Sequence, residues 1–152
     1  MAVITVETER EIAAPVARVF ECIADFKTQR PKWLPPAYSN LSVEQGGTGA
    51  GTIVRYHLKV GPRERDYRMQ VSEPAPGSVL QEKDTTSSLV TTWTVSPQGG
   101  GARVQVATRW NGASGFGGFM ERTFAPRGLK RLYDDELSRL AGYATGNASS
   151  ST

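Results

Sequence analysis

Residues 52–71 read TIVRYHLKVGPRERDYRMQV, and this stretch decides the class of fold. Apolar side chains from Val54 to Val60 alternate with polar ones, which is the period of a β-strand with one buried face. Gly61–Pro62 is a turn signal, and the alternation resumes after it through Tyr67 and Met69. The stretch therefore predicts a β-hairpin with one apolar and one polar face.

The same pattern continues on both sides of this hairpin, from Asn40 to Asn111. Turn signals rich in glycine and proline occur at 46–51, 74–77 and 97–101. They delimit six strands of an antiparallel meander, expected at 41–43, 52–60, 65–73, 79–85, 89–96 and 103–111. A further short strand is expected at 4–6.

Helical spacing occurs on either side of the meander. Pro15 is expected to open a helix that runs to residue 26 or 27 with one apolar stripe, and a short turn carries Trp33. After the meander, apolar residues recur at helical spacing from 116 to 140, with an interruption predicted at Pro126. A sheet with one apolar face needs a cover, and this C-terminal helix is the long candidate.

Composition sets limits on the class of protein. The 152 residues fit one domain, with a net charge of +3 that is too small to indicate a nucleic-acid partner. A single cysteine and a single histidine exclude an internal disulfide and a metal site built from several such residues. No apolar run is long enough for a membrane span, and residues 1–7 lack the features of a signal peptide. We therefore expect a cytoplasmic monomer or homodimer with no metal and no cofactor, with one domain at 1–144 and a disordered tail at 145–152.

Several short motifs, taken in order, resemble a known family. They are IAAPVARVF at 12–20, DF at 25–26, WLP at 33–35, GTIVRY at 51–56, VSEP at 71–74 and WTVSP at 93–97. The sequence from about residue 4 to 144 resembles the polyketide cyclase/dehydrase branch of the START-like (SRPBCC) superfamily. The resemblance implies an α+β helix-grip fold, in which a curved antiparallel sheet of about seven strands surrounds a long C-terminal helix, with two short N-terminal helices.

The resemblance also implies an apolar cavity between the sheet and the terminal helix. Members of the superfamily bind lipids, sterols, polyketides or hormone-like molecules, and a few catalyse cyclisation or aromatisation there. The family has no universal catalytic motif, so no catalytic role is carried onto a residue of this chain.

Strand parity and helical spacing select the residues expected to contact a ligand in this cavity. They are aromatic or apolar side chains on the inward face, together with threonines. The set is Tyr56, Tyr67, Met69, Thr91, Trp93, Thr108, Trp110, Phe116, Phe119, Met120 and Phe124.

The candidate acid–base groups are Tyr67, Tyr56 and Glu82. If Glu82 is buried, it could serve as a general acid or base, but the favoured interpretation is a charge at the strand end that reaches water. Residues 134–136 (DDE) are interpreted as a solvated helix face, from which Glu136 could instead turn to an internal contact.

Other conspicuous residues are assigned structural roles. Cys22 is interpreted as a buried hydrophobe, and His57 is expected on the solvent side of the sheet with Arg55. The glycine-rich segment 47–51 precedes a strand, so it is a hairpin turn and not a phosphate loop. Residues 115–118 (GFGG) could be the hinge of a gate to the cavity or a simple strand-to-helix turn.

Together these patterns favour the binding or carriage of a small hydrophobic ligand in an internal cavity, either a lipid, a polyketide or an aromatic compound. A polyketide cyclase or aromatase-like enzyme is the alternative. A regulatory or chaperone-like partner that holds an apolar segment of another protein is a third hypothesis.

Overall fold

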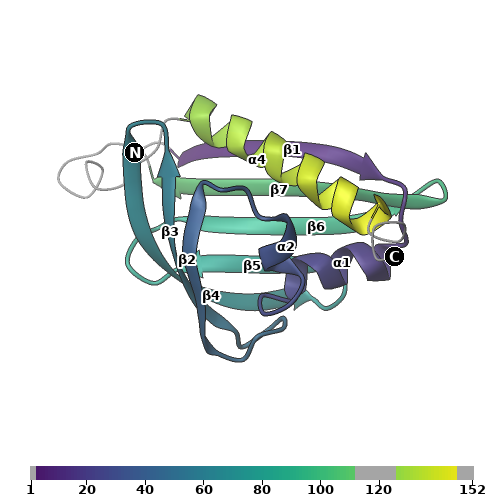
Figure 1. Ribbon diagram of the computed structural model, residues 1–152, viewed down its shortest axis with the longest axis horizontal. Helices are drawn as coiled ribbons and strands as arrows, with labels where there is room; N and C mark the ends of the chain where they lie inside the picture. The colour runs from purple at the N-terminus through teal and green to yellow at the C-terminus, as the bar shows by residue number, and fades with distance from the viewer. Residues whose placement is uncertain (1–2, 112–125, 147–152) are drawn as a thin grey trace.

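The computed structural model describes residues 3–111 and 126–146 (Figure 1). The strands are β1 (Val3–Ile12), β2 (Tyr38–Gln45), β3 (Ile53–Val60), β4 (Arg63–Ala75), β5 (Val79–Asp84), β6 (Val90–Gln98) and β7 (Gly101–Asn111). The helices are α1 (Val16–Ala24), α2 (Arg30–Trp33) and α4 (Pro126–Ala141), followed by the π-helical turn η1 (Gly142–Gly146).

Within the described residues, seven strands form one antiparallel sheet in the order β1-β7-β6-β5-β4-β3-β2. From β2 to β7, each strand pairs with the next strand in the sequence, and β1 pairs with β7 at one edge of the sheet. The sheet bends so strongly that β2 and β3 pass in front of β4 to β7, and α4 lies diagonally across the enclosed face (Figure 1). The predicted helix-grip fold is confirmed.

The first strand is longer than its sequence suggested. Apolar alternation predicted only residues 4–6, but β1 pairs with β7 from Val3–Asn111 to Ile12–Ala102. Most side chains between Glu7 and Glu11 are exposed, so this half of the strand has no apolar signal. Main-chain hydrogen bonding to β7, which no pattern in the β1 residues reveals, extends the strand.

The ends of the helices also differ from the prediction. Pro15 caps α1 in an extended conformation, and α1 ends at Ala24 because Asp25 is extended. The side chain of Asp25 then accepts hydrogen bonds from the main-chain N–H groups of Lys27 and Thr28, which begin the turn into α2. Pro126, where an interruption was predicted, is the first residue of α4.

The apolar core lies between the sheet and the helices. The stripe on α1 is buried through Val19 and Ile23, and the stripe on α4 through Leu129, Leu137 and Leu140. The turn η1 continues to Gly146, so residues 145 and 146, expected in a disordered tail, have a defined conformation. The predicted gate at 115–118 and the residues Phe116, Phe119, Met120 and Phe124 lie outside the described residues.

Candidate functional site

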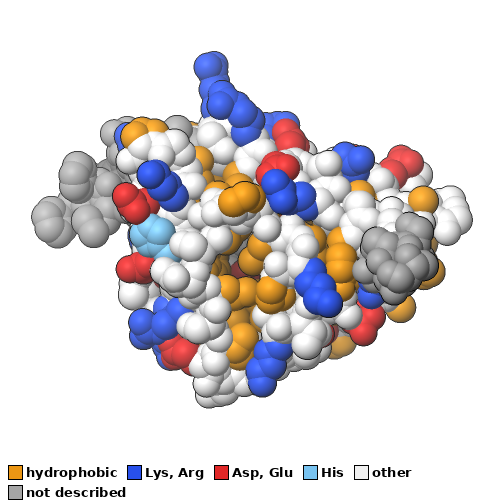
Figure 2. Space-filling view, viewed as in Figure 1, with side chains coloured by type: hydrophobic (Ala, Val, Ile, Leu, Met, Phe, Trp, Pro, Cys, Tyr) orange, Lys and Arg blue, Asp and Glu red, His pale blue; other side chains and the backbone are white. Residues whose placement is uncertain are grey.

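A cavity lies between α4 and the enclosed face of the sheet. The space-filling view has a hollow near its centre with a largely hydrophobic rim and an acidic side chain at its floor (Figure 2). Fifteen described residues line the cavity: Arg30, Leu34, Tyr38, Leu41, Tyr56, Leu58, Tyr67, Met69, Glu82, Leu89, Thr91, Trp93, Leu129, Tyr133 and Glu136.

The cavity is narrow in this conformation. Its volume is about 30 Å³, which is room for one or two water molecules, within about 530 Å³ of empty space that includes the open mouth. Tyr38 and Tyr56 are half-buried members of its wall. A ligand with an aromatic ring therefore requires some of these side chains to move apart.

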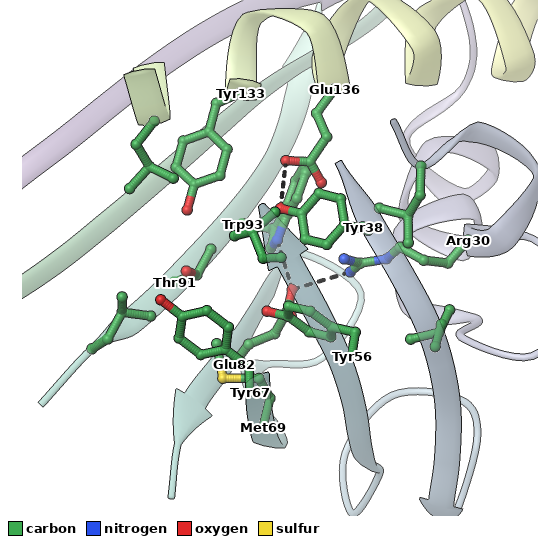
Figure 3. Close-up of a pocket in the computed structure, with 15 residues that line it drawn as sticks. Arg30, Tyr38, Tyr56, Tyr67, Met69, Glu82, Thr91, Trp93, Tyr133 and Glu136 are labelled. Atoms are coloured by element: carbon green, nitrogen blue, oxygen red, sulfur yellow. Dashed lines mark hydrogen bonds and ion pairs between the residues drawn. The ribbon is translucent and has the colours of Figure 1, made fainter. Parts of the chain in front are cut away.

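A buried ion pair forms one side of the cavity wall. The guanidinium of Arg30 in α2 lies 3.2 Å from the carboxylate of Glu82 in β5, and both residues are less than 5% exposed. The same Oε2 atom of Glu82 accepts a hydrogen bond of 2.9 Å from the indole N–H of Trp93 (Figure 3). Arg30 also donates two hydrogen bonds to the main-chain oxygen of Ile23, at 3.0 and 2.8 Å. A charge pair this far from water is held in place by hydrogen bonds on both partners.

Aromatic rings enclose the guanidinium of Arg30. Its central carbon lies 4.3 Å from the ring centre of Phe26, 5.3 Å from that of Trp33 and 5.2 Å from that of Trp93. Trp33 and Trp93 meet edge to face at 5.9 Å. Cation–π attraction therefore adds to the fixed position of Arg30.

Glu136 faces the cavity from α4, opposite the sheet. It is 1% exposed, and the phenol of Tyr38 in β2 donates a hydrogen bond of 3.2 Å to its Oε1 (Figure 3). Burial raises the pKa of Glu136 to about 8, although the charge of Arg30 opposes the shift. At neutral pH this carboxyl group is therefore mostly protonated and can donate a hydrogen bond.

Phenols and threonine hydroxyls supply the remaining polar atoms. The hydroxyls of Tyr133 and Thr108 lie 2.5 Å apart, and Thr108 lies 2.7 Å from the hydroxyl of Thr91. Burial raises the pKa of Tyr133, and it raises the pKa values of Tyr38 and Tyr56 well above their ordinary value. These phenols stay neutral at any physiological pH.

Three tyrosine rings contact one another across neighbouring strands of the cavity wall. The ring of Tyr56 in β3 lies 5.2 Å from that of Tyr38 in β2 and 5.6 Å from that of Tyr67 in β4. On Tyr67, the guanidinium of Arg65 lies 4.5 Å from the ring centre. The rings are inclined to one another, by 70° for Tyr38 and Tyr56 and by 33° for Tyr56 and Tyr67, so they present both ring faces and ring edges to a ligand.

The structure brings most of the described candidate residues together. Six of the sequence candidates line the cavity, namely Tyr56, Tyr67, Met69, Glu82, Thr91 and Trp93. Thr108 is buried behind the wall, where it contacts Tyr133, and Trp110 is buried in the core without lining the cavity.

One sequence interpretation is wrong, and for a second the alternative holds. Glu82 does not reach water at a strand end: it is buried, where Arg30 supplies the opposite charge and Trp93 donates a hydrogen bond to it. In the acidic segment 134–136, Asp134 and Asp135 are exposed as expected and pair with Lys130 and Arg139. Glu136 is buried and makes the internal contact that was the alternative for it, with Tyr38.

Arg30, Tyr38 and Tyr133 also line the cavity, although they were not among the residues predicted from the sequence. Tyr133 and Glu136 could have been found, because both follow Leu129 on one helical face at spacings of four and seven. Arg30 offered no signal, since it begins a four-residue helix beside Pro31 and its acceptor Glu82 is 52 positions away.

The remaining conspicuous residues have structural surroundings. His57 lies on the outer side between Asp66 and Glu64, whose hydrogen bonds raise its pKa. Cys22 is buried, and burial raises the pKa of its thiol, so it is a poor nucleophile. Within 3–111 and 126–146 there is no cluster of three His, Cys, Asp or Glu side chains that could hold a metal. In the same ranges, no helix combines the length and apolar character needed to cross a membrane.

Solved structures of several other proteins have the same fold as this chain. The solution structure of the KanY protein (ms6282) is 41% identical, with a TM-score of 0.83 over 95% of this chain and 99% of that one. The Zhui aromatase/cyclase from a Streptomyces species is 18% identical, with a TM-score of 0.72 over 94% of both chains. The major latex-like protein 151 of Panax ginseng is 9% identical, with a TM-score of 0.74 over 94% and 98%.

A search of curated proteins gave no match. The family model described as polyketide cyclase/dehydrase and lipid transport matches residues 3–145, nearly the whole chain. The chain belongs to this polyketide cyclase/dehydrase and lipid transport family.

Proposed function

We propose that the protein binds a small hydrophobic ligand, of lipid, polyketide or aromatic character, in the cavity beneath α4. The observation that carries this proposal is the composition of the wall. Apolar and phenolic side chains surround three buried groups that can form hydrogen bonds, Arg30, Glu82 and Glu136. Buried polar groups are costly in a plain core, whereas a few of them in an apolar wall orient a ligand.

The proposed ligand contacts come from two sides of the cavity. Tyr56, Tyr67 and Met69 would stack on or pack against the ligand from β3 and β4, and Thr91 and Trp93 from β6. Their neighbouring positions on the lining support this assignment. Phe116, Phe119, Met120 and Phe124 remain proposed contacts on the grounds of helical spacing alone.

Native mass spectrometry of freshly purified protein tests this proposal. We expect a species heavier than the 16.5 kDa chain that releases a small hydrophobic molecule on gentle activation. If the protein is purified empty, naphthalene should bind, and in an NMR titration the indole N–H signal of Trp93 should shift. Trp110 provides the internal control because it does not line the cavity. An empty protein whose Trp93 signal is unchanged by naphthalene would contradict the proposal.

A polyketide cyclase or aromatase-like activity is the second candidate, and Glu136 favours it. A carboxyl group with a pKa of about 8 beside a ligand cavity can both give and take a proton near neutral pH. The neighbour that is named an aromatase/cyclase adds support from the same fold.

Turnover of a poly-β-ketone distinguishes the two candidates. Under the binding proposal, the protein produces no cyclised product above the uncatalysed rate. Under the enzyme proposal, product forms, and Glu136→Gln, Glu82→Gln or Tyr67→Phe abolishes turnover while the affinity stays within about tenfold. Tyr56→Phe tests the other tyrosine predicted from the sequence as an acid–base group in the same assay.

A further inference from the structure

Three acidic or basic side chains are among the described residues of the cavity lining, namely Arg30, Glu82 and Glu136. We propose that the cavity is specific for an uncharged ligand that donates a hydrogen bond to Glu82 and accepts one from Glu136, and that it rejects ligands carrying a carboxylate, such as fatty acids. This inference rests on the proposed function, since it names the chemical class of ligand that the same cavity takes.

The positive charge of the cavity is already neutralised. Arg30 would be the natural partner of a ligand carboxylate, and among the described residues of the lining it is the one Arg or Lys. However, Glu82 lies 3.2 Å from the guanidinium of Arg30, and the main-chain oxygen of Ile23 accepts hydrogen bonds from two of its N–H groups. A second carboxylate would compete with Glu82 for one cation.

Glu82 retains the capacity to accept a hydrogen bond. Arg30 and Trp93 both donate to Oε2, and Oε1 accepts no hydrogen bond from the described residues. A carboxylate oxygen facing a narrow cavity favours a hydroxyl or an N–H group of a ligand and repels an anion.

Glu136 supplies the complementary donor. The titratable groups around it are Tyr38 of β2, Tyr56 of β3, Arg30 of α2 and Glu82 of β5, with Tyr133 and Asp135 on its own helix α4. Its pKa of about 8 means that at pH 7 roughly nine carboxyls in ten hold a proton. The carboxyl group then offers an O–H to a carbonyl, ether or hydroxyl oxygen.

With Glu136 protonated, the formal charges of the lining sum to zero, and an anionic ligand would leave the site with an unpaired buried charge. Such a charge is strongly unfavourable in an apolar interior. An uncharged ligand satisfies Glu82 and Glu136 without this penalty. Glu82 and Glu136 therefore select ligands by their charge as well as forming hydrogen bonds to them.

Two probes of the same shape test the inference. 2-Naphthamide is uncharged and both donates and accepts hydrogen bonds, whereas 2-naphthoate carries a carboxylate in the same position. We expect isothermal titration calorimetry at pH 7 to show that 2-naphthamide binds at least tenfold more tightly. Equal affinities, or tighter binding of 2-naphthoate, would overturn the inference.

Glu82→Gln provides the sharpest variant because it leaves Arg30 without its counter-ion. In this variant we expect 2-naphthoate to bind more tightly than 2-naphthamide, which reverses the selectivity. Asp134→Asn is the matched control, since it removes one negative charge from an exposed position on α4 and should leave the ratio unchanged. An unchanged ratio in a folded Glu82→Gln protein would overturn the inference.

The pH dependence of the wild-type protein tests the inference without any variant. Both probes keep their charge between pH 6 and 9, so a fall in 2-naphthamide affinity as pH passes about 8 reports the loss of the Glu136 proton. A flat profile would remove Glu136 from the proposal. Failure of the proposed function gives a different result, in which naphthalene, 2-naphthamide and 2-naphthoate all fail to bind.

Discussion

The Arg30–Glu82 pair shows at the scale of single residues how the cavity wall is stabilised. Both side chains are almost completely removed from water, and each makes a further hydrogen bond, Arg30 to Ile23 and Glu82 with Trp93. The rings of Phe26 and Trp93 also contact the guanidinium of Arg30. Removal of one partner leaves the other as an unpaired charge in the interior. Breaking the pair is therefore expected to lower the free energy of unfolding by more than the intact pair adds to it.

Replacement of Arg30 tests this view. Arg30→Met should lower the free energy of unfolding by about 3–5 kcal/mol, measured by urea denaturation, because Glu82 is left buried and unpaired. The double variant Arg30→Met, Glu82→Gln should recover a large part of the loss. The matched control Arg103→Met, which breaks the exposed pair with Glu9, should cost less than about 1 kcal/mol. An equally small loss in Arg30→Met would contradict the account.

Glu136 predicts a characteristic dependence of stability on pH. Its pKa is about 8 in the folded protein and near 4.5 when unfolded, so the folded state binds the proton more tightly. The stabilisation is complete below about pH 4.5 and is lost as pH rises to about 8, by up to about 1.4 kcal/mol per pH unit. Between pH 5 and 8, urea denaturation should show the wild type losing stability relative to Glu136→Gln. A constant difference between the two proteins would show that Glu136 ionises normally.

At the scale of elements, the sheet was predictable because its strands have a clear period of two. Alternation identified the hairpin of β3 and β4, and Gly61–Pro62 identified its turn. The length of β1 was not predictable, because half of it is polar and hydrogen bonding to β7 extends it to Ile12. The same pairing brings the main chain of Ile12 against Gly101, at the start of β7.

Gly101 tests this close approach of two elements. A Cβ atom there would lie 2.4 Å from the main-chain oxygen of Ile12, whereas one at Gly100 would meet nothing within 4 Å. Gly101→Ala should therefore lower the thermal midpoint and cost about 1–3 kcal/mol, because backbone must shift. Gly100→Ala is the matched control and should stay within about 0.5 kcal/mol of the wild type. Equal effects of the two changes would show that β1 and β7 do not meet as described.

At the scale of the whole molecule, the order of strands and helices determines the fold, and the fold places the cavity. The inward parity of Tyr56, Met69 and Trp93 was sufficient to predict that they share one surface. The chemistry of the cavity was not predictable, since Arg30 meets Glu82 across 52 positions and Tyr38 meets Glu136 across 98. Sequence periodicity reports which face a residue occupies, and it does not report which distant residue lies opposite.

The most direct test of the central claim is to locate a bound ligand inside the protein. With ¹³C-labelled methyl groups and unlabelled naphthalene, intermolecular nuclear Overhauser effects should connect the ligand to the methyl of Met69, which lines the cavity and is 1% exposed. The exposed methyls of Val3 should show none. Effects confined to Val60 and Leu132, which line a separate groove between the β3–β4 turn and α4, would contradict binding in the cavity.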